Sequence, residues 1–278
     1  MIILRLLPLI LLFASGASSF PAPALTVSGA YGYTHYYPDD LNAVNRIFEK
    51  TSRDFGFNGY TVRPFNGHAE EMVGLGLLWR RLEFSMEAEI WKEQFSQSNV
   101  NFTYSGLTGT VNADENYLFL PVTLMLKYPV RLGRFLIMPG YGPGIMFGSA
   151  TVNMSTAYYG TRPDDKMGLS FTSGINVIHR LCLDAYYRFL PWLGAGVSGG
   201  YRFSTIPYLE VSDKSGSSYI FDRLFNGGAV KGDRLFTRYD NLNFLKESDK
   251  LPSHHLVQGD MTGYYLWLKL IFIIGAKK

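Results

Sequence analysis

Apolar and polar residues alternate with a period of two along most of the chain. In the first such segment Leu25, Val27, Tyr31 and Tyr33 share one face, and small polar residues share the other. This period is typical of half-buried β-strands, because successive side chains point to opposite sides of a strand. The same alternation recurs in seven further segments, at residues 73–79, 84–90, 118–128, 135–147, 169–189, 193–203 and 264–272. In the segment 169–189 the apolar residues keep odd positions throughout, which predicts one long strand with its odd-numbered face outward.

The connections between these eight segments are alternately long and short. Short turns are expected near residues 80–82, 129–133 and 190–191, whereas residues 37–71, 94–115, 149–168 and 205–262 form long connections. Outer-membrane barrels have short periplasmic turns, long extracellular loops and an even number of strands that are apolar outside and polar inside. The pattern therefore predicts an all-β protein, an antiparallel eight-stranded transmembrane β-barrel with long extracellular loops. Residues 20–278 would form this single barrel domain.

A soluble secreted lipocalin-like binding barrel is the alternative, and it would turn the apolar rows inward. The rows opposite the apolar residues carry many charges, which favours the membrane assignment. We expect these charges to face the lumen and to pair there, because an isolated charge in such a place is costly. Eight strands enclose a space that side chains largely fill, so a structural plug is favoured over a gate, and a wide pore is excluded. The predicted lumen charge network consists of Glu87, Glu89, Asp184, Arg188, Arg202 and Lys269.

Two local features modify this picture. Pro121, Pro139 and Pro143 each lack an N–H donor, so we expect bulges or early strand ends at these positions. In the first long connection, an acidic pair at residues 39–40 precedes apolar residues with helical spacing up to Phe48. This pattern predicts a short loop helix.

The N-terminus has the features of a secretory signal peptide. Arg5 precedes a short apolar run, and small residues at Ala17 and Ser19 suit a cleavage site, so residues 1–19 are assigned to the signal. No later stretch has 18 uncharged apolar residues, so the remaining chain could cross a membrane only as a closed barrel. The net charge of +3 comes without a basic stripe, which argues against nucleic acid as a partner. The single cysteine, Cys182, excludes an internal disulfide and cysteine-rich zinc modules.

Three stretches resemble the small bacterial outer-membrane β-barrels of the OmpA-transmembrane-domain-like and OmpW-like group. They are residues 119–128 (FLPVTLMLKY), 140–144 (GYGPG) and 187–196 (YRFLPWLGAG). The resemblance implies insertion in the bacterial outer membrane, no cofactor, and a role in permeability, adhesion or envelope integrity. In one respect the chain departs from this family, because Phe272 is followed by six more residues where such barrels usually end on an aromatic residue.

The function expected of this chain is binding at its long surface connections. The connection 205–262 mixes aromatic residues with arginines, which suits binding of an extracellular ligand or polysaccharide. Outer-membrane lipid is the other expected partner, and we expect a monomer with a structural, adhesion or narrow-channel role. A rim-active lipid or peptide hydrolase is an alternative, but hydrolase motifs such as His-Glu-x-x-His are absent, so no catalytic or metal site is predicted. Candidates for such a rim site would be His68, Glu70, Asp164, Asp165, His254 and His255.

Overall fold

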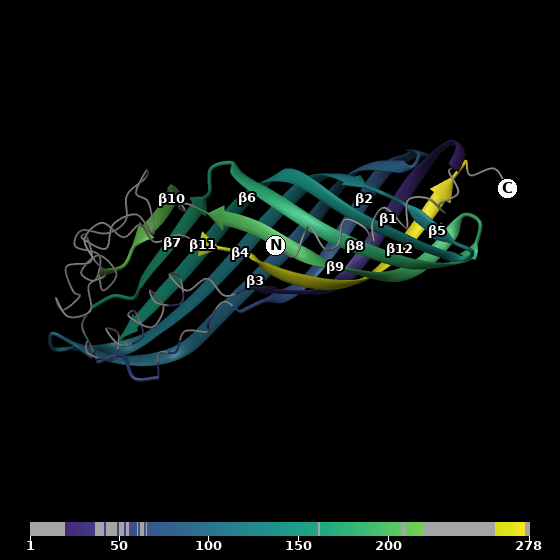
Figure 1. Cartoon of the computed structure of the whole chain (residues 1–278). Coiled ribbons are helices and arrows are strands. Elements are labelled where there is room, and N and C mark those ends of the chain that lie inside the picture. The colour runs from purple at the N-terminus through teal and green to yellow at the C-terminus, as the bar shows by residue number, and fades with distance from the viewer. Residues whose placement is uncertain are drawn as a thin grey trace, which may run out of the picture.

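The computed structural model contains a closed antiparallel ring of eight strands. It describes residues 20–36, 66–160, 162–206, 210–219 and 259–275, together with residues 42, 49, 53, 56–59, 61 and 64. Around the ring, each strand pairs with the next and the last pairs with the first. The ring therefore has no free edge and is a β-barrel (Figure 1). In ring order the strands are β1 (Phe20–Tyr36), β2 (His68–Arg80), β3 (Leu82–Tyr104), β4 (Leu107–Lys127), β6 (Phe135–Tyr158), β8 (Asn176–Leu190), β9 (Leu193–Ile206) and β12 (Gly263–Ile274).

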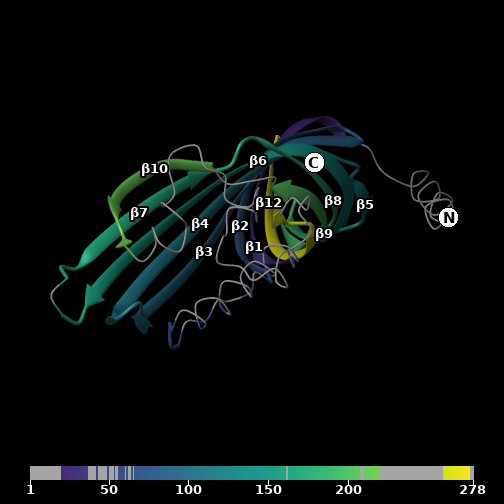
Figure 2. The ribbon, with the colours of Figure 1, turned by 90° about the vertical axis from the view of Figure 1, so that its left-hand side faces the viewer.

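Part of the sheet continues far beyond one end of the ring. β3, β4 and β6 are 23, 21 and 24 residues long, and their distal halves pair with β7 (Asp165–Thr172) and β10 (Glu210–Ser217). We call this five-stranded extension the blade; it comprises residues 93–104, 107–117 and 149–158 with β7 and β10 (Figure 2). Two short strands complete the set: β5 (Val130–Leu132) pairs with β6, and β11 (Gly259–Asp260) pairs with β9.

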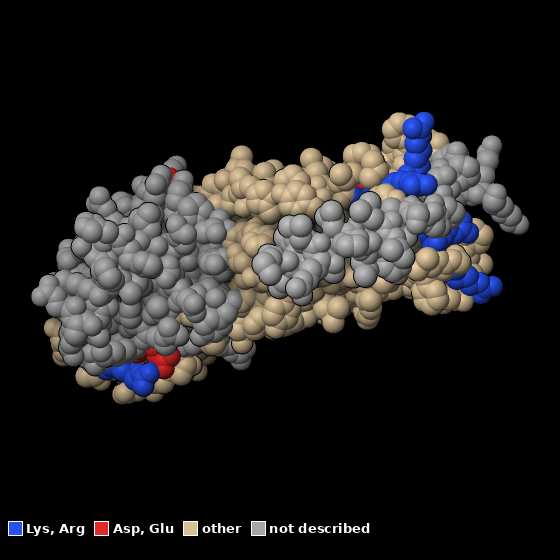
Figure 3. All heavy atoms as spheres, viewed as in Figure 1, with Lys and Arg blue, Asp and Glu red and all other residues tan. Residues whose placement is uncertain are grey.

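The two faces of the ring have opposite character. Its outward face carries apolar side chains such as Val73, Leu124 and Leu268, which are 62–70% exposed. Its inward face carries the charged rows, which are buried. Space-filling atoms show the described wall almost free of charge between the basic end and the opposite, blade end (Figure 3). The soluble lipocalin-like alternative requires the apolar residues to face the lumen, whereas in the structure they face outward.

The predicted single strand over residues 169–189 is wrong. The chain forms β7 and β8 instead, separated by residues 173–175. In β7 the odd residues Leu169 and Phe171 are buried on the inner face of the blade, whereas in β8 the odd residues Val177 and Leu183 face outward. The three-residue break exchanges the two faces. Because the odd row is apolar on both sides of the break, periodicity alone does not reveal it.

Two of the predicted long connections are largely strand. Residues 94–115 form a hairpin of β3 and β4 that turns at residues 105–106, and most of 149–168 belongs to β6 and β7. The connection 205–262 also contributes strands, β10 and β11. The signal segment and the residues that predict the loop helix lie outside the described part of the chain. No helix in that described part is long and apolar enough to cross a membrane.

The bulges expected at the three prolines do not form. Pro121 pairs with Met146, while Pro139 and Pro143 face Leu183 and His179, all without a shift of register. A proline removes one ladder hydrogen bond to one neighbour, and the long ladders on both sides keep the register across that gap. The three prolines are therefore accommodated inside continuous strands.

Candidate functional site

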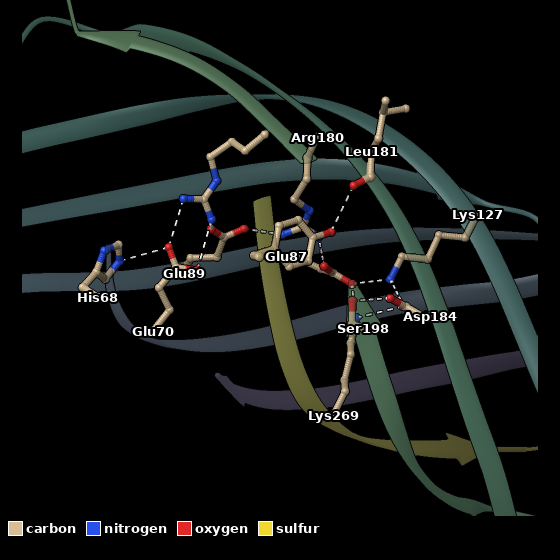
Figure 4. A network of polar contacts seen from close by, with 12 residues as sticks. His68, Glu70, Glu87, Glu89, Lys127, Arg180, Leu181, Asp184, Ser198 and Lys269 are labelled. Carbon is tan, nitrogen blue, oxygen red and sulfur yellow. Dashed lines mark hydrogen bonds and ion pairs between the residues drawn. The ribbon is translucent and has the colours of Figure 1, made fainter. Parts of the chain in front are cut away.

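The inward faces of six ring strands converge on a buried network of ion pairs. β2 contributes Glu70, β3 contributes Glu87 and Glu89, and β4 contributes Lys127. β8, β9 and β12 supply the others, because their inward rows also carry charged residues. Figure 4 shows these side chains pointing toward one another inside the ring. The additional members are Arg180 and Asp184 on β8, Arg202 on β9 and Lys269 on β12.

Two arginines occupy the half of the network nearest the blade. Arg202 holds both carboxylate oxygens of Glu70, with Nη1 and Nη2 at 2.9 and 3.2 Å, and also donates to Glu89. Arg180 donates one Nη group to Glu89 and the other to Glu87. The flat guanidinium group suits such shared contacts, because it presents several donors in a fixed arrangement. Carboxylates and arginines therefore alternate across the lumen.

Two lysines occupy the other half of the network. Lys127 Nζ lies 2.5 Å from Glu87 and 2.8 Å from Asp184, and Lys269 Nζ lies 2.9 and 3.1 Å from the same two carboxylates. Asp184 also accepts hydrogen bonds from the hydroxyls of Ser198, at 2.5 Å, and Tyr186, at 3.2 Å. The network thus joins four acids to four bases, and its formal charge is zero.

The predicted lumen residues are only partly brought together. Glu87, Glu89, Asp184, Arg202 and Lys269 lie in the network. Arg188 does not; its Nη2 donates to the carbonyl of Pro191 at the short-turn end, 2.7 Å away. The sequence reasoning missed Glu70 and Lys127 as members and did not assign Arg180 to the network. Strand parity was the available signal, since all three lie on the inward rows of their strands.

Water is excluded from the network within the described part of the molecule. All eight charged side chains are 2% exposed or less. On the blade side Trp91 stacks on His68 at 4.1 Å between ring centroids and lies 4.6 Å from both Tyr36 and Phe119. On the short-turn side an apolar cluster packs across the lumen. The members of this cluster are Ala24, Leu78, Leu136, Met138, Tyr186, Ile271 and Ile273.

The filled lumen determines what the network can do. Burying an ion removes it from water at a cost of several kcal/mol, so each charge needs close partners. Here each base contacts two carboxylates, which supplies those partners. A continuous aqueous path would have given these side chains measurable exposure. The arrangement is therefore that of a closed polar plug between an aromatic layer and an apolar layer.

Among the described residues, the candidates for a rim enzyme do not form an accessible site. His68 Nε2 and Glu70 Oε1 lie 3.1 Å apart, but both side chains are buried. Asp165 accepts a hydrogen bond from the Tyr158 hydroxyl at 2.8 Å, and Asp164 accepts one from the Tyr158 backbone. The two remaining candidates, at positions 254 and 255, lie outside the described residues. The described part of the chain contains no cluster of three or more His, Cys, Asp or Glu residues able to hold a metal ion.

The blade presents different residues on its two faces. Its inner face is apolar and includes Phe102, Val111 and Phe171, which are buried. Its outer face continues the outward face of the ring, but the residues there change to amides and hydroxyls, among them Asn116 and Thr151. The outward face of one continuous sheet is therefore apolar around the ring and polar along the blade.

Comparison with known proteins gives a weak structural likeness. No family model matches this chain, and no curated protein matches it. A solved structure of a major outer membrane protein from Thermus thermophilus aligns with a TM-score of 0.43 and 12% identity, covering 91% of this chain and all of that one. The outer membrane protease OmpT from Escherichia coli aligns with a TM-score of 0.29 and 10% identity, covering 92% and 98%. Similarity at this level carries no argument about the present chain, and the resemblance to the OmpA-like and OmpW-like group is not tested by it.

Proposed function

We propose that this chain is a bacterial outer-membrane barrel that spans the membrane with its eight-stranded ring and holds its lumen closed. The blade would then stand outside the cell and carry a structural or adhesive binding function. The observation that carries this proposal is the outward belt, a predominantly apolar surface around buried, paired charges. Only a lipid environment stabilises such a surface around a closed barrel.

The height of the belt fits a bilayer. On β2 the outward Glu71 and the exposed Arg80 at the strand end bound it, and on β3 the outward Lys92 bounds it opposite Arg81 in the preceding turn. Nine residues at about 3.3 Å each cover roughly 30 Å along the strand, or about 23 Å along the barrel axis at a tilt of about 40°. Outer-membrane barrels have an apolar band about 25 Å tall. The exposed arginines at the short-turn end then lie at the periplasmic headgroups.

The lipid contact can be tested with spin labels at outward positions. In a Cys182→Ser background, a label at Leu183→Cys should respond to oxygen dissolved in lipid, and a label at Asn116→Cys should respond to a water-soluble nickel chelate. Leu183 is 54% exposed on the belt, whereas Asn116 is exposed on the blade. Power-saturation spectra of the protein in vesicles would measure both responses. Equal access of the nickel chelate to the two labels would contradict the proposed membrane span.

A closed lumen makes a prediction about conductance. In planar bilayers the native chain should show no discrete current steps, and Lys269→Met should also show none while lowering stability. Both carboxylates that Lys269 contacts also contact Lys127, so each keeps one base when Lys269 is replaced. The methionine side chain then occupies the space of the lysine side chain, so the lumen stays filled. Regular conductance steps that appear only in Lys269→Met would show that the network is a gate rather than a plug.

A further inference from the structure

A shallow groove crosses the outer face of the blade. Residues from β4, β6, β7 and β10 line it, so four strands contribute to one surface. Its volume is about 430 Å³, which lies inside the range of roughly 300–1,000 Å³ found for small-ligand sites. Most of its polar lining is exposed to solvent. The polar side chains that line it are Asn112, Asp114, Asn153, Ser155, Lys166 and Ser215.

One wall of the groove is held in place by hydrogen bonds. Asn112 accepts the backbone N–H of Asn99 at 2.7 Å, and its amide donates to Ser155 at 3.4 Å. Asp114 accepts the hydroxyl of Ser96 at 2.5 Å. These contacts fix the direction of the amide and the carboxylate before any ligand arrives, which lowers the entropy that binding must overcome.

The opposite wall has free hydrogen-bonding groups. The side chains of Asn153, Lys166 and Ser215 make no hydrogen bond or ion pair with another described residue. Between Asn153 and Ser215 lies Gly168, on the neighbouring strand of both. A Cβ atom at Gly168 would lie only 2.7 Å from Ser215 Oγ and 3.1 Å from Asn153 Oδ1. The missing side chain therefore lets Ser215 and Asn153 place their polar atoms close together over Gly168, and a larger residue there would displace them.

The composition of the groove narrows the class of ligand. Its charges are one carboxylate and one ammonium, so it has no excess charge for an anionic or a cationic ligand. The groove crosses strands that are paired on both sides, so an added peptide strand would find no free backbone groups at β6 or β7. Amides and hydroxyls offer both donors and acceptors, which matches a ligand rich in hydroxyl groups. Met154 and Met167 also line the groove, but their side chains pack in the apolar cluster on the inner face of the blade.

We propose that this groove binds a neutral oligosaccharide chain. The inference rests on the proposed function, which puts the outer face of the blade directly above the lipid headgroups. Such a chain can belong to a glycolipid of the outer leaflet or to a free polysaccharide, and the same groups recognise both. Asn153, Ser215 and Lys166 donate to sugar hydroxyls, and Asp114 accepts from them.

Binding can be measured on the full chain in detergent micelles and in vesicles. Soluble neutral oligosaccharides of four to six units, built from glucose, galactose, mannose or N-acetylglucosamine, would be titrated by calorimetry. We expect saturable binding of at least one of them, or of vesicles carrying a glycolipid with a neutral headgroup. Binding of the free sugars identifies a soluble source, and binding of the vesicles alone identifies a lipid-borne source. Gly168→Val, whose side chain would displace Ser215 Oγ and Asn153 Oδ1, should weaken binding at least tenfold.

Matched variants separate the groove from the rest of the blade. Asn153→Ala removes a free donor and acceptor without adding bulk, and it should also weaken binding several-fold. Asn116→Ala and Thr151→Ala lie on the same face outside the groove and should leave affinity within twofold. Failure of every probe to bind, or binding that Gly168→Val and Asn153→Ala leave unchanged, would overturn the inference. The spin-label experiment on the same preparations reports membrane insertion independently, so loss of the proposed span and loss of sugar binding are distinguishable.

Discussion

Replacing Arg202 with methionine should lower the free energy of unfolding by about 3–5 kcal/mol, because removal of one partner leaves a buried charge uncompensated. Arg202 is fully buried and holds Glu70 through two hydrogen bonds while also contacting Glu89. Methionine fills a similar volume but offers neither carboxylate a donor. The change is measured by urea unfolding of the purified protein in micelles, followed by tryptophan fluorescence and by heat-modifiable migration.

Arg188→Met is the matched control for this loss. Arg188 also points inward on a ring strand, but its Nη2 contacts only the carbonyl of Pro191 and it lies outside the ion-pair network. Its replacement should cost about 1 kcal/mol, the typical value of one hydrogen bond. In a second control, Glu70→Gln combined with Arg202→Met should recover part of the loss, because Glu70, which has Arg202 as its only base in the network, is then neutral, whereas Glu89 keeps Arg180. Equal destabilisation by Arg202→Met and Arg188→Met would contradict the role given to the network.

Leu124→Arg should reduce the amount of protein that inserts into the membrane. Leu124 lies on the outward belt and is 62% exposed. An arginine on the lipid face of a barrel costs about 2–4 kcal/mol at the bilayer midplane. The measurement is the fraction of protein recovered in the outer-membrane fraction, or folded in vesicles, relative to the native chain.

Asn116→Arg gives the matched comparison on the same strand and the same face. Asn116 lies eight residues from Leu124 along β4, at the blade level, where the outward residues are polar. An arginine there stays in water and should leave insertion unchanged. If both substitutions reduce insertion equally, the belt does not contact lipid.

The alternation of odd and even positions in the sequence predicted which side of a ring strand carries the charged residues. The inward rows of β3, β8, β9 and β12 agree with the structure, and the turns near residues 81 and 191 lie where expected. This alternation does not determine where a side chain lies along the axis of the lumen. Asp184 and Arg188 share one inward row, yet only Asp184 joins the ion-pair network, since Arg188 lies four residues nearer the short-turn end and meets no carboxylate of the network.

The blade shows a second limit of the same reasoning. Its outer face is polar because it faces water, so residues 94–115 and 149–168 lack the strong alternation of the ring segments and resemble loops. Each of them is a local hairpin, β3–β4 or β6–β7, and further pairing with strands that are distant in sequence joins the hairpins into the blade. Thr110 pairs with Ala157, and Lys166 pairs with Ser217, which comes from the long last connection.

By itself the sequence determined the period of two, the all-β class, the inward side of the charges on β3, β8, β9 and β12, and the short turns near residues 81 and 191. These properties depend on local backbone geometry, which neighbouring residues encode directly. Only the tertiary structure decided which charges meet, where the strand from residue 169 breaks, and that half of the sheet continues as a blade. Glu87 and Arg180 are 93 residues apart in the chain, and closure of the ring, which fixes the stagger of its strands, is what brings them into contact.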